Sequence, residues 1–291
     1  MNDSRKWVLL TSAVLLAGCA STTQLSDGCA STVENASYTG PYRGPDDRLT
    51  AEELARDLRC AAKFKAEKHP RGFVAIYGSS RIRESNSQAD PSIKAANDAL
   101  YREVYKFAKG WTEKYGRQWP VLTGGGTGLM EAAARGAVNA GGSSIGYTTY
   151  YGDSRDHGGQ PEKAFATYSA VDGTKQKIIT DGLIFSSVGI REYAMFLHST
   201  AVVLAPGGSG TEWEIFQILE SIKSGQLGPI PVYLLGPKTP HWDSFYARLE
   251  DMAKRGTVRP NEVEQHFQHV ETAEQLIGLA GPKLIQASAN K

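Results

Sequence analysis

The sequence has few of the residues that hold metal ions or covalent cross-links. Its 291 residues include three cysteines and six histidines, which are scattered along the chain. The closest pair of histidines, His266 and His269, has no cysteine partner and no His-Glu-x-x-His pattern, so we expect no metal site. Beyond Cys19 only two cysteines remain, which is too few for a disulfide scaffold.

An excess of charge of one sign is missing as well. The chain has 32 Lys and Arg residues against 31 Asp and Glu residues, a formal net charge of +1. No stripe dense in Lys and Arg runs along it, and its aromatic residues fall mostly on predicted core faces. We therefore expect no nucleic-acid partner. A hydrophobic content of 41% is that of an ordinary globular protein.

Long apolar runs are also absent. The N-terminal run over residues 7–17 has eleven residues, whereas a transmembrane helix needs about 20. Arg5 and Lys6 precede this run, which closes on Leu16-Ala17-Gly18-Cys19. The pattern resembles a bacterial lipoprotein signal, the alternative being a buried N-terminal helix. It predicts a signal peptide over residues 1–18.

Cys19 would then be the first residue of the mature protein and would carry the lipid that anchors it to a membrane. Ala20 and Ser21 follow it in place of an aspartate, which is typical of lipoproteins of the outer membrane. We therefore expect a bacterial cell-envelope protein, lipid-anchored at the outer membrane and facing the periplasm. Several acyl chains on one residue anchor a protein firmly.

The segment after the predicted signal peptide has little to bury. Residues 19–49 are rich in Ser, Thr, Gly and Asp and have few apolar side chains, which predicts a flexible tether. An oxidising periplasm would allow Cys29 in this tether to pair with Cys60. The alternative is two unpaired thiols, and the sequence does not decide between them.

Regular structure is predicted from Thr50 onward, as one domain over residues 50–291. Thr50 and Glu53 form a potential capping box for a helix that ends before Pro70. Strands are expected at 73–77, around 121, at 144–148, at 182–187, at 200–205 and at 230–235, the last completing the sheet. Helices are expected between them at 91–115, at 129–137, from 191 and from about 211 to 222. This alternation predicts an α/β fold with a doubly wound, Rossmann-like parallel sheet.

The most informative motif is the run from Pro206 to Glu214, which reads Pro-Gly-Gly-Ser-Gly-Thr-Glu-Trp-Glu. It follows an apolar strand and precedes a helix. A helix N-terminus offers unpaired backbone N–H groups and a partial positive charge, and glycines allow a phosphate to approach them closely. The run therefore predicts a phosphate and ribose site, with the Glu214 carboxylate one turn into the helix.

A second glycine run, Thr123 to Gly128, also lies between a predicted strand and a helix. This second run is not a dinucleotide fingerprint, since Leu129 stands where the third glycine would be, counted from Gly124. Neither run ends in the Lys-Ser/Thr pair of a P-loop, so NAD and nucleoside triphosphates are poorly supported. Ser209 is not a nucleophile elbow, because the residue two positions later is a threonine.

Together these runs resemble the LOG family, the lysine-decarboxylase-like proteins whose hallmark is Pro-Gly-Gly-x-Gly-Thr-x-x-Glu. The run from Pro206 to Glu214 matches this hallmark throughout. The resemblance extends over about residues 72–240 and includes Ile76-Tyr77-Gly78-Ser79-Ser80-Arg81, the run 123–137, and Arg191 with Met195. One position departs from the family pattern, which usually has Arg-Lys where this chain has Arg191-Glu192.

The resemblance implies an activity. Enzymes of this family cleave the N-glycosidic bond of nucleoside 5′-monophosphates, which predicts hydrolysis of AMP or a cytokinin-like nucleotide to a free base and ribose 5-phosphate. It implies no cofactor, and a homodimer with the active site near the interface. The alternative is a non-catalytic nucleotide-binding or sensing lipoprotein, which Glu192 and the extracytoplasmic location favour.

The resemblance also implies roles for individual residues. Arg191 and Glu214 would be catalytic, with Glu214 acting on the ribose hydroxyls or the attacking water and Arg191 orienting the nucleotide. The residues expected to bind phosphate and nucleotide are Gly207, Gly208, Ser209, Gly210, Thr211, Gly78, Ser79, Gly124, Gly125, Gly126 and Glu131. Glu131 has an alternative role as a helix cap. Met195 is equally a core residue or a part of the base pocket.

Overall fold

The structure is a computed structural model that describes residue 29 and residues 50–84, 90–149, 165–170 and 173–289. The predicted signal peptide over 1–18, the predicted lipid site at Cys19 and all of the predicted tether except Cys29 lie outside the described residues. Within the described residues, no helix has the length and apolar character needed to cross a membrane.

A seven-stranded sheet forms the centre of the molecule, with the strand order β6-β3-β2-β1-β7-β8-β9. Every neighbouring pair of strands is parallel. The strands are β1 (Phe73–Tyr77), β2 (Val121–Thr123), β3 (Ser144–Thr149), β6 (Asp181–Phe185), β7 (Ser199–Leu204), β8 (Val232–Leu235) and β9 (Phe267–Val270). The predicted doubly wound parallel sheet is confirmed.

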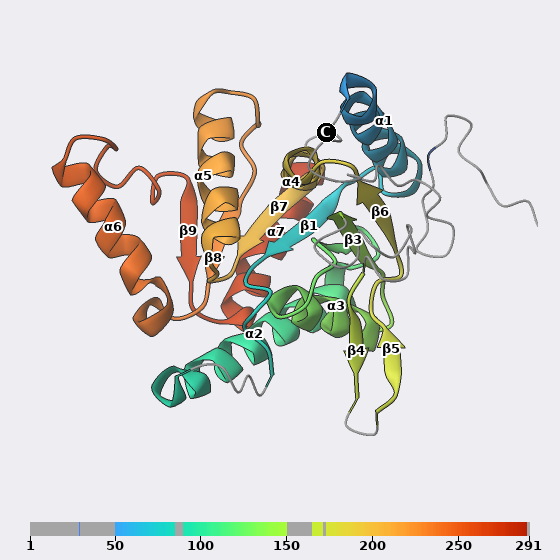
Figure 1. The fold of residues 1–291 in the computed structure, drawn as a ribbon, viewed down its shortest axis with the longest axis horizontal. Helices are drawn as coiled ribbons and strands as arrows, with labels where there is room; N and C mark the ends of the chain where they lie inside the picture. The colour runs from blue at the N-terminus through green and yellow to red at the C-terminus, as the bar shows by residue number, and fades with distance from the viewer. Residues whose placement is uncertain (1–28, 30–49, 85–89, 150–164, 171–172, 290–291) are drawn as a thin grey trace, which may run out of the picture.

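Helices cover both faces of this sheet (Figure 1). One face carries α1 (Ala51–Lys68), α4 (Val188–Leu197), α5 (Ser209–Lys223) and α6 (Asp243–Lys254), and the other carries α2 (Pro91–Tyr115), α3 (Leu129–Asn139) and α7 (Ala273–Ala289). Along β1, Phe73, Ala75 and Tyr77 pack into the first layer, whereas Val74 and Ile76 pack into the second. Burial on both sides explains why the strands are almost continuously apolar.

Several predicted boundaries move. Helix α4 begins at Val188 and not at Arg191, because the Ser187 hydroxyl caps it by accepting a bond from the Ile190 N–H at 3.3 Å. Helix α5 begins at Ser209, two residues before the predicted start at Thr211. The prediction that the strand at 230–235 completes the sheet is wrong, since β9 pairs with β8 on its outer side.

Other elements have no counterpart in the sequence prediction. Strands β4 (Thr167–Ser169) and β5 (Lys175–Lys177) form a separate antiparallel pair. A short helical segment, Lys238–Trp242, precedes α6 and is interrupted at Thr239.

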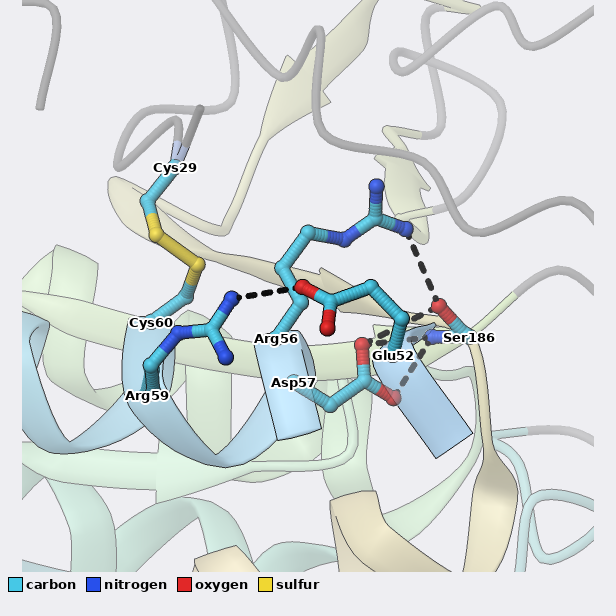
Figure 2. Close-up of a disulfide and its surroundings, with 7 residues drawn as sticks. All are labelled: Cys29, Glu52, Arg56, Asp57, Arg59, Cys60 and Ser186. Carbon is cyan, nitrogen blue, oxygen red and sulfur yellow. Dashed lines mark hydrogen bonds and ion pairs between the residues drawn. A yellow bond between two sulfur atoms is a disulfide. The ribbon is translucent and has the colours of Figure 1, made fainter. Parts of the chain in front are cut away.

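Two interactions stabilise the N-terminal helix α1: a capping box at its start and a disulfide. The predicted capping box is present, because the Thr50 side chain accepts from the Glu53 N–H at 3.2 Å and the Glu53 carboxylate accepts from the Thr50 N–H at 2.8 Å. The structure also joins Cys60 of α1 to Cys29 in a disulfide with a Cα–Cα distance of 5.5 Å (Figure 2). Of the two states that the sequence leaves open, the structure has the bridge.

Candidate active site

The strand order locates the candidate site at the middle of the sheet. The chain proceeds from β1 outward through β2, β3 and β6, then returns to the other side of β1 to form β7. Ligands of open parallel sheets bind beyond the carboxyl ends of the strands at such a reversal. The glycine turns that follow β1, β2 and β7 meet there around a cavity of about 930 Å³.

Most of the residues predicted for the site line this cavity. They are Gly78, Ser79, Gly124, Gly125, Gly126, Gly208, Ser209, Gly210, Thr211, Arg191 and Glu214. Three predicted residues are not among the described residues that line it, namely Gly207, Glu131 and Met195. Segments more than a hundred residues apart in the sequence therefore contribute to one cavity.

Each of the three non-lining residues has a packing or bonding role. Gly207 lies directly against Thr211, so that a Cβ on this glycine would be 2.1 Å from the Thr211 Oγ1. The Glu131 carboxylate accepts a hydrogen bond from the Tyr101 hydroxyl at 2.8 Å. Met195 is completely buried, and its sulfur lies 3.4 Å from the Arg191 Nη1. In the structure Met195 is therefore a core residue that contacts the Arg191 side chain.

The N-terminus of α5 faces the cavity with Ser209, Gly210 and Thr211. Gly208 is its N-cap residue and supplies no side-chain hydrogen bond to the first turn. The first N–H groups of a helix have no partner within the helix. This terminus can therefore hold an anion by backbone donors and by the helix dipole.

The same cavity contains a cluster of buried charges. The exposed fractions are 6% for Arg191, 3% for Glu192 and 9% for Glu214, and all three residues line the cavity. The Arg191 guanidinium forms an ion pair with the Glu192 carboxylate. Gly124 leaves room for this arrangement, because a Cβ there would be 2.7 Å from the Arg191 Nη1.

Burial changes the protonation of both acids. Burial, and then the charge of Glu192, raise the pKa of Glu214 well above its usual range, while Arg191 opposes the rise. Burial likewise raises the pKa of Glu192, opposed chiefly by Arg191 beside it. The side chains of Glu192 and Glu214 also lie within hydrogen-bonding distance of each other. At least one carboxyl of this pair therefore holds a proton at pH values where an exposed glutamate is ionised.

Tyr77, the last residue of β1, lies beside this cluster and was not a predicted site residue. Its hydroxyl is buried and has no hydrogen-bond partner within the described part of the chain. Burial and the nearby Glu192 and Glu214 raise the pKa of Tyr77 well above 10. Its position directly before Gly78, at the end of the first core strand, is the sequence signal that would have pointed to it.

The cavity also has apolar and aromatic walls that the sequence prediction missed. Phe165, Met130, Val188 and Trp213 line it, and the Trp213 side chain is 43% exposed. Flat aromatic side chains can stack on a heterocyclic base. The sequence carries no signal for Phe165, which reaches the cavity only because it packs beside Gly125 and Gly146.

The helix that carries Arg191 is held at its start by α1. The buried Asp57 carboxylate accepts a hydrogen bond from the backbone N–H group of Ser186 at 2.9 Å (Figure 2). It also accepts one from the backbone N–H group of Ser187 at 3.0 Å. Within the described residues, no group of three or more His, Cys, Asp or Glu side chains is placed to hold a metal ion.

Comparison with known proteins identifies a matching family model. The model described as "Possible lysine decarboxylase" matches residues 130–279, which is more than half of the 291-residue chain. The search of curated proteins found no match.

The chain is also similar to solved structures. One is the molybdenum cofactor carrier protein of Chlamydomonas reinhardtii, with 18% identity, a TM-score of 0.45, and coverage of 74% of this chain and 99% of that one. Another is DNA processing protein A of Streptococcus pneumoniae, with 11% identity, a TM-score of 0.39, and coverage of 72% of this chain and 62% of that one.

Proposed function

Because the chain belongs to the LOG family of lysine-decarboxylase-like proteins, we propose that it hydrolyses the N-glycosidic bond of a nucleoside 5′-monophosphate. The products would be a free base and ribose 5-phosphate, and AMP or a cytokinin-like nucleotide would be the substrate. The observation that carries this proposal is the convergence of Arg191 and Glu214 with the α5 N-terminus in one cavity. Such a cavity offers separate groups to the phosphate, the sugar and the base.

The phosphate would bind at the N-terminus of α5. The backbone N–H groups of Ser209, Gly210 and Thr211 lie in the first turn, where an anion is stabilised by unpaired donors and the helix dipole. Arg81 also lines the cavity and would add positive charge to this end. The 5′-phosphate would thus fix the nucleotide with its ribose toward Glu214.

The sugar would react beside Glu214. Breaking a ribose–base bond develops positive charge on the sugar, which a fixed carboxylate stabilises. Glu214, once ionised, would stabilise this charge and take a proton from the attacking water. An arginine side chain stays protonated in proteins, so Arg191 would act by hydrogen bonding to the nucleotide and not by giving up its proton. Phe165 and Trp213 would contact the departing base.

A lysine decarboxylase of the pyridoxal phosphate type fits the cavity poorly. Such enzymes hold the cofactor through a lysine Schiff base. The described residues that line the cavity include Arg81 and Arg191 but no lysine. We therefore propose a reaction that requires no cofactor.

The test is chromatography of the free base released from a panel of nucleoside 5′-monophosphates by the full chain. We expect release from at least one nucleotide, and its loss in Glu214→Gln. Glu212→Gln is the matched control, since Glu212 lies on the same helix but is ion-paired with Arg248 at 2.7 Å. If no nucleotide is cleaved yet one still binds, the chain is the nucleotide-binding or sensing lipoprotein instead.

We also propose that the protein is attached to the cell envelope through a lipid on Cys19, at the outer membrane and facing the periplasm. The Cys29–Cys60 disulfide supports this location, because such bridges persist in oxidising compartments. Membrane fractionation with fatty-acid labelling would test it. Cys19→Ser should abolish the label and release the protein, and retention of the label would contradict the proposal.

A homodimer is the third part of the proposal. Leu58 on α1 and Val188 and Leu197 on the adjacent α4 are large apolar side chains that are 38–41% exposed. Val188 also lines the cavity, so a second copy on these helices would lie near the site. Light scattering on the full chain in detergent should give twice the mass of one chain. Leu197→Glu should reduce the measured mass toward that of a single chain.

A further inference from the structure

Glu192 is buried in the candidate site without a role in the proposed reaction. It is 3% exposed and lines the same cavity as Glu214, which reaches it from a different helix. The two side chains lie within hydrogen-bonding distance of each other. Carboxylates are acceptors only, so a hydrogen bond between them requires a proton on one of the two. Like charges this close cannot both persist in a buried site.

The neighbours of the pair decide which acid holds the proton. Arg191 forms its ion pair with Glu192 and so keeps the negative charge on that residue. The other oxygen of Glu192, Oε2, is buried and, apart from a protonated Glu214, has no hydrogen-bond donor among the described groups. Among the described residues, Tyr77 on β1 also faces the pair, and its raised pKa keeps it protonated near neutral pH. The proton therefore lies on Glu214.

We propose that Glu192 is a positioning residue, which holds the Arg191 guanidinium in place and shares a single proton with Glu214. Loss of this proton to water converts Glu214 into the carboxylate that the reaction needs. This role rests on the proposed function, in which ionised Glu214 acts on the ribose and the attacking water. Glu192 thus sets the pH at which the site becomes active.

The direction of the pH effect follows from the same contacts. Burial and the charge of Glu192 raise the pKa of Glu214, so kcat/KM rises with pH as Glu214 loses its proton. Glu192→Gln removes the like charge, adds an amide donor and removes the carboxylate that competes with Glu214 for Arg191. All three changes lower the pKa of Glu214. We expect the rise in kcat/KM to move to a pH lower by about one or more, and KM to increase because Arg191 loses its anchor.

Infrared titration of the full chain, without any substrate, tests the shared proton directly. A protonated carboxylic acid has a carbonyl band that ionised carboxylates lack. We expect such a band to persist in the wild-type protein at pH 7, to be reduced in Glu214→Gln, and to titrate at a lower pH in Glu192→Gln. Glu212→Gln on the same helix is the control and should titrate as the wild type does.

Two results would overturn the inference: no difference between the wild type and Glu214→Gln at pH 7, or an unshifted titration in Glu192→Gln. If Glu192→Gln fails to fold by circular dichroism, the first comparison still decides. The titration needs no nucleotide, so its outcome is separate from that of the hydrolysis assay. If the titration shows the shared proton but no nucleotide releases its base, the result would support the acid pair and contradict only the proposed hydrolysis.

Discussion

Asp57 and Ser186 are 129 residues apart in sequence, yet both carboxylate oxygens of Asp57 accept hydrogen bonds from the Ser186 N–H, at 2.9 and 3.1 Å. The same carboxylate accepts from the Ser187 N–H, directly before α4. Helix α4 carries Arg191 and Glu192 into the candidate site. A buried acid on α1 therefore fixes the start of the helix that supplies the arginine.

Asp57→Ala should lower the free energy of unfolding by about 3 kcal/mol, because it leaves buried backbone N–H groups without an acceptor. Urea unfolding would measure this loss. Asp251→Asn is the matched control, since its exposed pair with Arg255 should contribute less than about 0.5 kcal/mol. Equal losses in the two variants would contradict an anchoring role for Asp57.

The Cys29–Cys60 disulfide joins two residues that are 31 positions apart in the sequence. Its loss in Cys29→Ser should lower the free energy of unfolding by about 3 to 4 kcal/mol, through the greater freedom of the unfolded chain. Denaturant titrations with and without a thiol reductant would measure it. The reductant should destabilise the wild type but leave Cys29→Ser unchanged, and a wild type that is insensitive to reductant would argue against the bridge.

The two adjacent glycines of the signature run should respond differently to substitution by alanine. In Gly207→Ala the new Cβ would be 2.1 Å from the Thr211 Oγ1 and must displace the first turn of α5, whereas a Cβ at Gly208 meets nothing within 4 Å. We expect a melting temperature several degrees lower for Gly207→Ala, equivalent to roughly 1 to 3 kcal/mol. Gly208→Ala should melt like the wild type. Thermal unfolding followed by circular dichroism would separate them.

The raised pKa of Glu214 predicts a pH-dependent cost to stability. A carboxyl whose folded pKa is raised contributes its stability fully below the unfolded value of 4.5, and this contribution is lost as pH rises through the folded pKa. Glutamine does not titrate, so Glu214→Gln should be more stable than the wild type, and increasingly so from pH 5 to pH 8.

The gain in the free energy of unfolding of Glu214→Gln should approach about 1.4 kcal/mol per pH unit where only the unfolded state ionises. Urea unfolding at both pH values would measure it. Glu212→Gln should instead parallel the wild type across this range. A constant difference between Glu214→Gln and the wild type would show that Glu214 is already ionised at pH 5.

Signals that are local in the chain predicted the fold well. The Thr50 and Glu53 capping box depends on a spacing of three residues, and the helix begins where that spacing requires. The apolar strands are predictable because burial on both faces makes them continuously apolar. The sequence pattern predicts α4 and α5 to begin a few residues after their true first residues. The reason is that a Ser187 cap and a glycine cap leave little apolar pattern to detect.

Non-local pairings were harder to predict. Strand β9 covers the outer edge of β8, and its residues Gln268 and His269 give it a partly polar sequence that does not resemble a core strand. The small β4–β5 pair is equally polar, with exposed Lys175 and Lys177. Such edge strands are defined by the hydrogen-bonding partner beside them and not by their own composition.

The sequence by itself determined the alternation of strands and helices, the family, and the glycine turns that come together at the ends of three parallel strands. Only the tertiary structure decided what those turns face. The direction of the Glu192 side chain depends on how α4 is held by Asp57 and on the space that Gly124 leaves for Arg191. The shared proton depends on α5 bringing Glu214 beside it in a buried site. Local sequence sets backbone preference, whereas charge burial and carboxyl pairing arise only from contacts between distant segments.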